Sequence, residues 1–147
     1  MRTINYIVVH CSATREDRPF TVEALRAVHL SRGFSDIGYH YYIRRDGTVV
    51  RTRPLALAGA HVKGYNKYSI GICYEGGLDA QGCPKDTRTP EQRAALRLLV
   101  HQLLRRFHSE VRVCGHRDLS PDRNGDGVVE PEEWVKVCPC FEVATEL

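Results

Sequence analysis

Two histidines and a cysteine, far apart in the sequence, are of the types that hold a catalytic metal ion. His10 ends an apolar run at residues 7–9, His116 follows another at residues 111–113, and Cys138 stands near the C-terminus. Two imidazoles and a thiolate are competent zinc ligands, and three protein ligands leave a fourth position for water. Their spacing matches no local zinc-finger pattern, so it leaves open whether they meet. If they do, the chain is expected to be a hydrolase.

The sequence segments around these residues resemble those of a known protein family, and they cover nearly the whole chain. The segments are VHCSAT at 9–14, GYHYYI at 38–43 with RDGT at 45–48, GAHVKGYN at 59–66, SIGI at 69–72, GHRD at 115–118 and CP at 138–139. In this order they resemble the zinc N-acetylmuramoyl-L-alanine amidases, the family of phage lysozyme-type amidases and peptidoglycan-recognition proteins.

The resemblance implies a site and a substrate. It implies that His10, His116 and Cys138 bind zinc, and that the substrate is the amide between the lactyl group of N-acetylmuramic acid and L-alanine. Tyr39 matches the family's active-site tyrosine, whose hydroxyl orients water or carries a proton. Lys136 matches its catalytic lysine, whose ammonium stabilises an oxyanion. Activity should fall in acid, because protonated ligands release metal.

Three residues of the 59–66 segment are candidates for holding substrate. His61 aligns with a histidine that lines the family's cleft, although a surface-loop histidine remains almost as plausible. Lys63 and Asn66 would hold glycan or peptide on the same rim. The other histidines carry no such motif. We expect them to be structural or helix-face residues: His29, His40, His101 and His108.

Residues 122–133 follow the twelve-position pattern of an EF-hand calcium loop. Oxygen-bearing side chains stand at positions 1, 3, 5, 9 and 12, and glycine stands at position 6. The expected ligands are Asp122, Asn124, Asp126, the Val128 carbonyl, Glu130 and Glu133. An acidic, glycine-rich turn that binds nothing is the alternative. Pro131 is expected to start a short exit helix that carries Trp134 and Lys136.

Apolar runs alternate with segments of helical periodicity, which predicts an α/β fold. We expect strands at residues 4–10, 39–44, 48–52, 69–74 and 111–114, and helices at 21–32 and 89–107. Asp46-Gly47 predicts a hairpin turn, and Thr89 with Gln92 fits a capping box. The resemblance implies a central mixed sheet of about five strands flanked by helices, with the calcium-type loop inserted near the C-terminus.

Composition and length restrict the remaining possibilities. The chain has 147 residues, 42% hydrophobic and 27% charged, which fits one soluble domain over residues 1–147. A net charge of +3 suits an anionic cell wall and is too small for a nucleic-acid-binding protein. We expect a monomer without stable membrane association. Because no signal peptide is evident, it should be made in the cytoplasm and act on peptidoglycan after export or lysis. We expect free thiols at Cys11, Cys73, Cys83 and Cys114.

Three other functions fit parts of the sequence. A recognition module would hold muropeptides without cutting them. A cysteine peptidase would use Cys11 as nucleophile, although its neighbour His10 should point to the opposite face of the strand. A structural zinc site would recruit Cys140 as a fourth ligand and exclude water.

Overall fold

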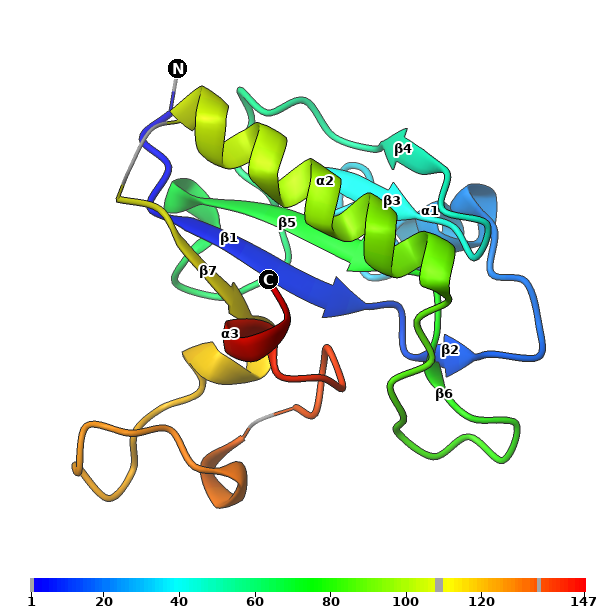
Figure 1. The fold of residues 1–147 in the computed structure, drawn as a ribbon. Coiled ribbons are helices and arrows are strands. Elements are labelled where there is room, and N and C mark those ends of the chain that lie inside the picture. The colour runs from blue at the N-terminus through cyan, green and yellow to red at the C-terminus, as the bar shows by residue number, and fades with distance from the viewer. Residues whose placement is uncertain (1, 108–109, 135) are drawn as a thin grey trace.

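The computed structural model, which describes residues 2–107, 110–134 and 136–147, has an α/β fold built around one mixed sheet (Figure 1). The sheet has five strands in the order β4-β3-β5-β1-β7, and a second sheet pairs β2 with β6. The predicted fold class is confirmed. The strands are β1 (Tyr6–Cys11), β2 (Thr14–Arg15), β3 (Tyr41–Ile43), β4 (Val49–Arg51), β5 (Ser69–Tyr74), β6 (Gly77–Leu78) and β7 (Arg112–Gly115). The helices are α1 (Val22–Ser31), α2 (Pro90–Phe107) and α3 (Val143–Glu146).

Strand β1 lies inside the sheet and pairs in parallel with both β5 and β7. Alternate side chains of a strand point to opposite faces. Ile7 and Val9 therefore join the large core beneath α2, whereas Val8 packs on the other face with Val62 and Cys114. His10 shares the face of Val8. The register thus directs the imidazole away from α2.

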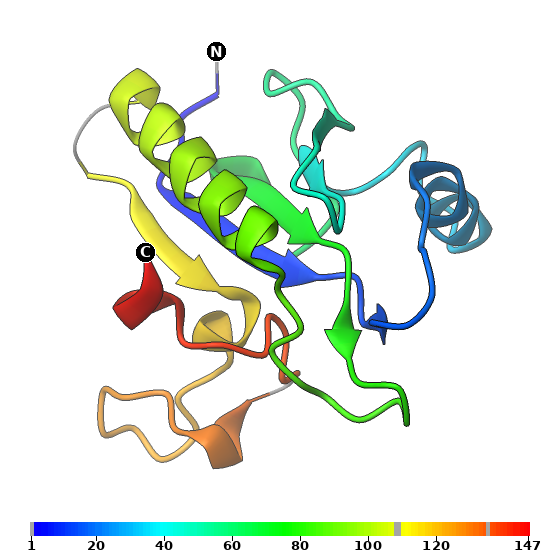
Figure 2. The ribbon, with the colours of Figure 1, turned by 45° about the vertical axis from the view of Figure 1, so that its right-hand side comes forward.

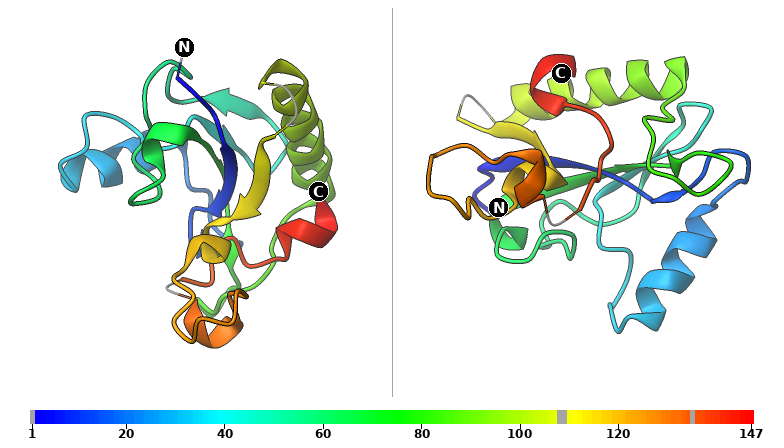
Figure 3. Two further views of the ribbon diagram at one scale, coloured as in Figure 1. Left: turned by 90° about the vertical axis from the view of Figure 1, so that its left-hand side faces the viewer. Right: turned by 90° about the horizontal axis from the view of Figure 1, so that it is seen from below.

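The two long helices cover opposite faces of the sheet, as the edge-on views show (Figure 3). Thr89 and Gln92 form the predicted capping box at the start of α2: the N–H of Gln92 donates to Thr89 Oγ1, and the N–H of Thr89 donates to Gln92 Oε1, both at 3.0 Å. Leu96 and Val100 then bury the inner face of the helix. This apolar stripe anchors α2 without occupying the other face of the sheet.

Helix α1 begins as predicted, because the side chain of Thr21 accepts a hydrogen bond from the N–H of Ala24 (3.1 Å). Leu25 packs against Tyr42 of β3 and Cys73 of β5 in a smaller core. Figure 2 shows α1 standing beyond the hairpin, well separated from α2.

The β3–β4 hairpin is shorter than predicted. Tyr41 pairs with Arg51 and Ile43 with Val49, and β3 is itself parallel to β5. Tyr39 therefore lies before the strand, in the connection from α1. The expectation that Tyr39 is a strand residue is wrong, because ladder pairing on the β4 side starts only at Tyr41.

The segment between β7 and α3 contains little regular structure. A 3-10 turn at His116–Leu119 follows β7, and another covers Pro131–Glu133. The second turn begins at Pro131, as predicted, but it ends at Trp134 with extended backbone. The prediction that this helix carries Trp134 and Lys136 is therefore wrong. Within the described ranges no helix combines the length and apolar character that a bilayer crossing requires.

Candidate functional site

A cleft of about 440 Å³ opens on the sheet face opposite α2, near the carboxyl ends of β1 and β7. The site residues predicted from the sequence, apart from the calcium-type loop, all line it, although they come from five separate segments. They are His10, Tyr39, His61, Lys63, Asn66, His116, Lys136 and Cys138. The fold therefore brings together the residues that the sequence leaves far apart.

His10, His116 and Cys138 converge within the cleft. One ligand atom from each lies within 4.8 Å of the other two, and the two imidazole centroids are 4.8 Å apart. The backbone N–H of Cys11 donates to Sγ of Cys138 (3.2 Å), which would stabilise a thiolate there. Two nitrogens and one sulfur are a donor set that suits Zn²⁺.

The electrostatics of the two histidines favour metal ligation. Burial, followed by the neighbouring His61 and His116, holds the pKa of His10 well below its usual 6.5. Burial and the Lys136 ammonium lower the pKa of His116 to about 4. Both rings are therefore neutral at pH 7, as metal ligation requires. Nε2 of His10 lies 2.8 Å from Nδ1 of His61, so the other ring nitrogen of His10, its Nδ1, is the one left for a cation.

Tyr39 and Lys136 border this group from two sides. The Tyr39 ring lies against His10, with centroids 4.9 Å apart. Burial and the thiols of Cys73 and Cys138 raise the pKa of Tyr39 well above 10, so its hydroxyl stays protonated. Lys136 is exposed at the rim of the cleft. The pair can thus offer a phenolic proton and a positive charge.

The 59–66 segment forms one wall of the cleft. Oδ1 of Asn66 accepts hydrogen bonds from the N–H groups of His61 and Val62, both at 2.9 Å. Asn66 therefore fixes the shape of the wall as well as lining it. Lys63 is exposed on the same wall.

The cleft is also lined by His29, Arg32 and Phe34, which lie outside the segments that carry the family resemblance. Nδ1 of His29 accepts the N–H of Gly38 (2.8 Å), and its ring lies 5.3 Å from that of Tyr39. His29 thus supports the segment that carries Tyr39. No local pattern marks this contact, because it depends on how α1 packs. His101 is exposed on α2, and His108 lies outside the described residues.

The two cysteines of the alternative functions are outside the metal-ligating group found among the described residues. The side chain of Cys11 is buried in the core beneath α2, on the face opposite His10. Cys140 Sγ lies 3.9 Å from Cys11 Sγ and 3.5 Å from the carbonyl oxygen of Gly77. Cys140 is not part of the metal-ligating group found among the described residues. This geometry disfavours both a Cys11 nucleophile and a closed four-ligand site.

The loop at residues 122–133 gathers part of its predicted ligand set. Carboxylate oxygens of Asp122, Asp126 and Glu133 lie within 4.8 Å of one another. Asp122 Oδ2 accepts the N–H of Gly127 (2.7 Å), and Glu133 accepts the N–H groups of Arg123 and Asn124. The carboxylates therefore already organise the backbone of the loop.

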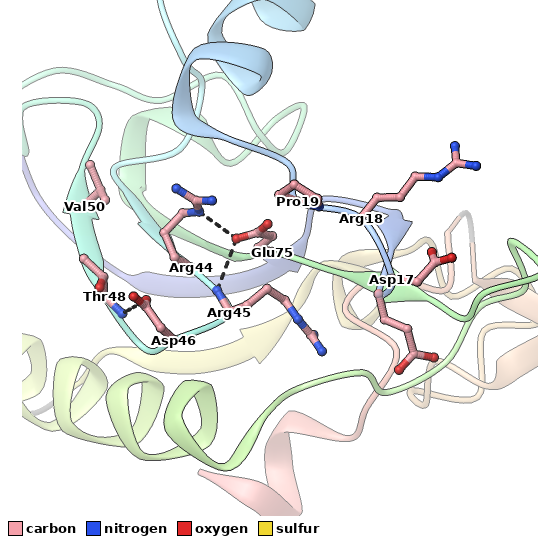
Figure 4. A pocket seen from close by; sticks show the side chains of 10 residues that line it. Asp17, Arg18, Pro19, Arg44, Arg45, Asp46, Thr48, Val50 and Glu75 are labelled. Atoms are coloured by element: carbon pink, nitrogen blue, oxygen red, sulfur yellow. Dashed lines mark hydrogen bonds and ion pairs between the residues drawn. The ribbon is translucent and has the colours of Figure 1, made fainter.

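A second hollow, of about 560 Å³, surrounds Glu75 beside the hairpin (Figure 4). Glu75 Oε1 accepts hydrogen bonds from Arg44 Nε (2.6 Å) and from the N–H of Arg45 (3.1 Å), and Oε2 accepts the N–H of Phe20 (2.7 Å). This buried carboxylate is satisfied by the protein itself. It joins the hairpin to the entry of α1 and has no evident part in chemistry.

His40 provides a pH-dependent test of the fold beneath the cleft. Its Nδ1 accepts the N–H of Gly71 (3.0 Å), and its Nε2–H donates to the carbonyl of Leu57 (2.8 Å). Burial lowers the pKa of His40 to about 4. Between pH 6.5 and 4 the unfolded chain binds more protons than the folded one, so acid favours unfolding. We expect the preferential protonation of His40 in the unfolded chain to lower the free energy of unfolding by about 3 kcal/mol between pH 7 and pH 4.

Urea unfolding of the metal-free protein at both pH values measures the total loss, and an NMR titration of His40 measures its own share. A His40 midpoint near pH 6.5 in the folded protein would contradict the expectation.

Comparisons with known proteins agree with this geometry. The N-acetylmuramoyl-L-alanine amidase family matches residues 1–132. The endolysin of Klebsiella phage KP32 is 40% identical over 137 residues, 93% of this chain and 81% of that protein. Peptidoglycan-recognition protein SC1a/b of Drosophila simulans is 31% identical over 125 residues, covering 80% of this chain and 65% of the relative.

The solved structures that resemble this one include the amidase LysC from Clostridium intestinale URNW. It has a TM-score of 0.73 and 28% sequence identity, and the match covers 99% of this chain and 82% of LysC. Bumblebee PGRP-SA has a TM-score of 0.74 at 25% identity, with 99% and 81% of the chains covered. The family match ends before Lys136 and Cys138, which the fold nevertheless returns to the cleft. The chain belongs to the N-acetylmuramoyl-L-alanine amidase family.

Proposed function

We propose that this member of the family is a zinc-dependent peptidoglycan hydrolase that cleaves the amide between N-acetylmuramic acid and L-alanine. The observation that carries the proposal is the convergence of His10, His116 and Cys138, whose ligand atoms lie within 4.8 Å of one another in an open cleft. Three ligands of this kind leave a coordination position for water, as catalytic zinc sites require.

The zinc would be held by Nδ1 of His10, an imidazole nitrogen of His116 and Sγ of Cys138. Bound Zn²⁺ supplies hydroxide at neutral pH by lowering the pKa of a coordinated water to about 7, and it polarises the scissile carbonyl. The N–H of Cys11 would stabilise the negative charge of a zinc-bound Cys138 thiolate.

Tyr39 and Lys136 would act on the substrate itself. The Tyr39 hydroxyl keeps its proton at neutral pH and its ring lies beside that of His10, so the phenol could orient the nucleophile and donate a hydrogen bond during attack. The Lys136 ammonium would stabilise the negative charge that develops on the carbonyl oxygen. Its rim position suits a side chain that approaches the substrate from solvent.

Lys63 and Asn66 would contact glycan or peptide along the wall of the cleft. Lys63 is exposed and free to reach an anionic group, such as a carboxylate of the stem peptide. Oδ1 of Asn66 accepts hydrogen bonds from the backbone of His61 and Val62, so its side-chain NH₂ group would be the part that contacts a ligand. His61 belongs to the same wall and has a second set of contacts, described below.

Digestion of purified peptidoglycan tests the proposed reaction directly. Mass spectrometry of the soluble products should show peptides that begin with alanine, together with glycans that carry free lactyl carboxyl groups. A chelator should stop their release, and added Zn²⁺ should restore it. Intact muropeptides after incubation with the zinc-loaded protein would reject amidase activity.

A second candidate function is recognition of muropeptides without hydrolysis, because the relatives include peptidoglycan-recognition proteins. The presence of Tyr39, Lys136 and Cys138 together in the cleft favours hydrolysis. Binding of muropeptide by the zinc-loaded protein without any product would select the recognition module instead.

The protein would reach the bacterial cell wall after export or host lysis, in line with the phage endolysins among the relatives. We propose that the chain works there as a monomer on peptidoglycan or muropeptides, without stable membrane association.

We also propose that the loop at residues 122–133 binds Ca²⁺. The support is the position-by-position match to an EF-hand loop and the approach of the Asp122, Asp126 and Glu133 carboxylates. Asn124, the Val128 carbonyl and Glu130 would complete the oxygen ligands. An ordered loop would hold the segment that leads to Lys136 and Cys138.

Calcium titration should show one site with a dissociation constant on the order of 10⁻⁴–10⁻³ M, because a single loop lacks a partner hand. Glu133→Gln should abolish uptake by removing the proposed bidentate ligand. Glu132→Gln is the matched control, since Glu132 is exposed and outside the group. Calorimetry without heat of binding at high millimolar Ca²⁺ would refute the site.

A further inference from the structure

The hydrogen bonds of His61 suggest more than contact with substrate. Nδ1 of His61 lies 2.8 Å from Nε2 of His10, and Nε2 of His61 lies 3.1 Å from Oγ of Ser69. Ser69 is fully buried at the start of β5. Both ring nitrogens of His61 are therefore engaged inside the protein.

The fold makes room for the His61 ring and fixes its position. A Cβ atom at Gly71 would lie 2.8 Å from the ring, and one at Gly59 would lie 2.6 Å from it. Gly71 pairs with Val8, two residues before His10, so the ring rests on the sheet beside the strand that carries the ligand. Asn66 holds the backbone of His61 from the other side. The ring is thus packed in one orientation, aimed at His10.

The chain of hydrogen bonds restricts how protons are placed. A neutral imidazole carries one N–H and one acceptor nitrogen. If His10 uses Nδ1 as a ligand, its Nε2 carries the proton and donates to Nδ1 of His61. His61 then carries its own proton on Nε2 and donates to Ser69. A metal on His10 therefore requires one tautomer of both rings.

We propose that His61 is a positioning residue for the metal ligand His10, acting with Ser69 as a buried relay that fixes the ring and tautomer of His10. The inference rests on the proposed zinc site and adds an outer hydrogen-bonding partner to it. Such partners orient metal-bound histidines, raise their basicity and commonly control metal affinity by 10–100-fold.

Zinc affinity, measured by competition with a chelator, tests this role without using activity. We expect His61→Ala to weaken zinc binding by about 10–100-fold. His61→Asn should recover to within about fivefold of the unsubstituted protein, because its amide oxygen can replace Nδ1 as the acceptor. His61→Gln places its amide near Nε2 instead and should not rescue. His101→Ala is the matched control, since His101 is exposed on α2.

A second measurement guards against loss of folding in these variants. Ser69→Ala keeps both rings and should weaken zinc binding less than His61→Ala does. In the metal-free, unsubstituted protein, nitrogen NMR should find His10 and His61 in the same tautomer, both protonated on Nε2 or both on Nδ1, because only these states make the bond between them.

Three results would overturn the inference: unchanged zinc affinity in His61→Ala, equal weakness in His61→Asn and His61→Ala, or opposite tautomers in the metal-free protein. An unsubstituted protein that binds no zinc would instead reject the proposed function, and the tautomer measurement would still decide whether His61 orients His10.

Discussion

Replacing Cys138 by serine should weaken zinc binding by more than about 100-fold, since even outer partners of metal ligands cost 10–100-fold. A thiolate is a strong ligand for Zn²⁺, whereas a serine hydroxyl keeps its proton at neutral pH. The hydrogen bond from the N–H of Cys11 would then face a neutral oxygen instead of a charged sulfur. Hydrolysis of peptidoglycan should disappear with the metal.

The matched control is Cys83→Ser, because Cys83 is an exposed thiol outside the cleft. Zinc content measured by mass spectrometry, and chelator competition, separate the two variants. If Cys138→Ser retained zinc at the level of Cys83→Ser, Cys138 would not be a ligand and the catalytic proposal would fail.

Tyr39→Phe should lower turnover by about 10²–10⁴-fold, the range for loss of a positioned proton-transfer group. Zinc affinity should not change, because the phenol is not a ligand and its ring would keep the contact with His10. The loss should appear in kcat rather than in KM, since the hydroxyl is expected to act during attack. Initial rates of muropeptide release give both constants.

Tyr68→Phe serves as the comparison, because Tyr68 is 48% exposed and lies outside the cleft. Full turnover by zinc-loaded Tyr39→Phe would remove Tyr39 from the mechanism and leave Lys136 as the remaining candidate for transition-state stabilisation.

The sequence predicted the sheet and the main helices well because their signals are local. The side chains of Thr21 and Thr89 cap their helices by accepting hydrogen bonds from backbone N–H groups three residues further along the chain. Asp46-Gly47 forms the turn of the hairpin, as expected. The exit helix begins at Pro131 as predicted, but its length was predicted wrongly. Its backbone becomes extended at Trp134, whose ring instead lies 3.9 Å from the guanidinium carbon of Arg117. Tertiary packing overrode a weak local preference there.

The candidate site was predictable in its residues but not in its contacts. The family resemblance pointed to His10, His116 and Cys138, and the fold supplied their meeting. The links from His10 to His61 and from His29 to Gly38 depend on packing across separate elements. A sequence motif records which residues are present, and it does not record which nitrogen of an imidazole faces its neighbour.

The long separation of His10 and Cys138 along the chain has a consequence for biosynthesis. His10 belongs to β1, between β5 and β7 in the sheet, whereas Cys138 comes only after β7 and the loop that follows it. Domains generally fold as units during synthesis, so the site is completed only after the segment that carries Cys138 has left the ribosome. A prematurely terminated chain would therefore lack the third proposed ligand as well as Phe141 and Val143, which belong to the same core as Ile7 and Val9 of β1. The proposed zinc site would thus be absent until nearly the whole chain had been made.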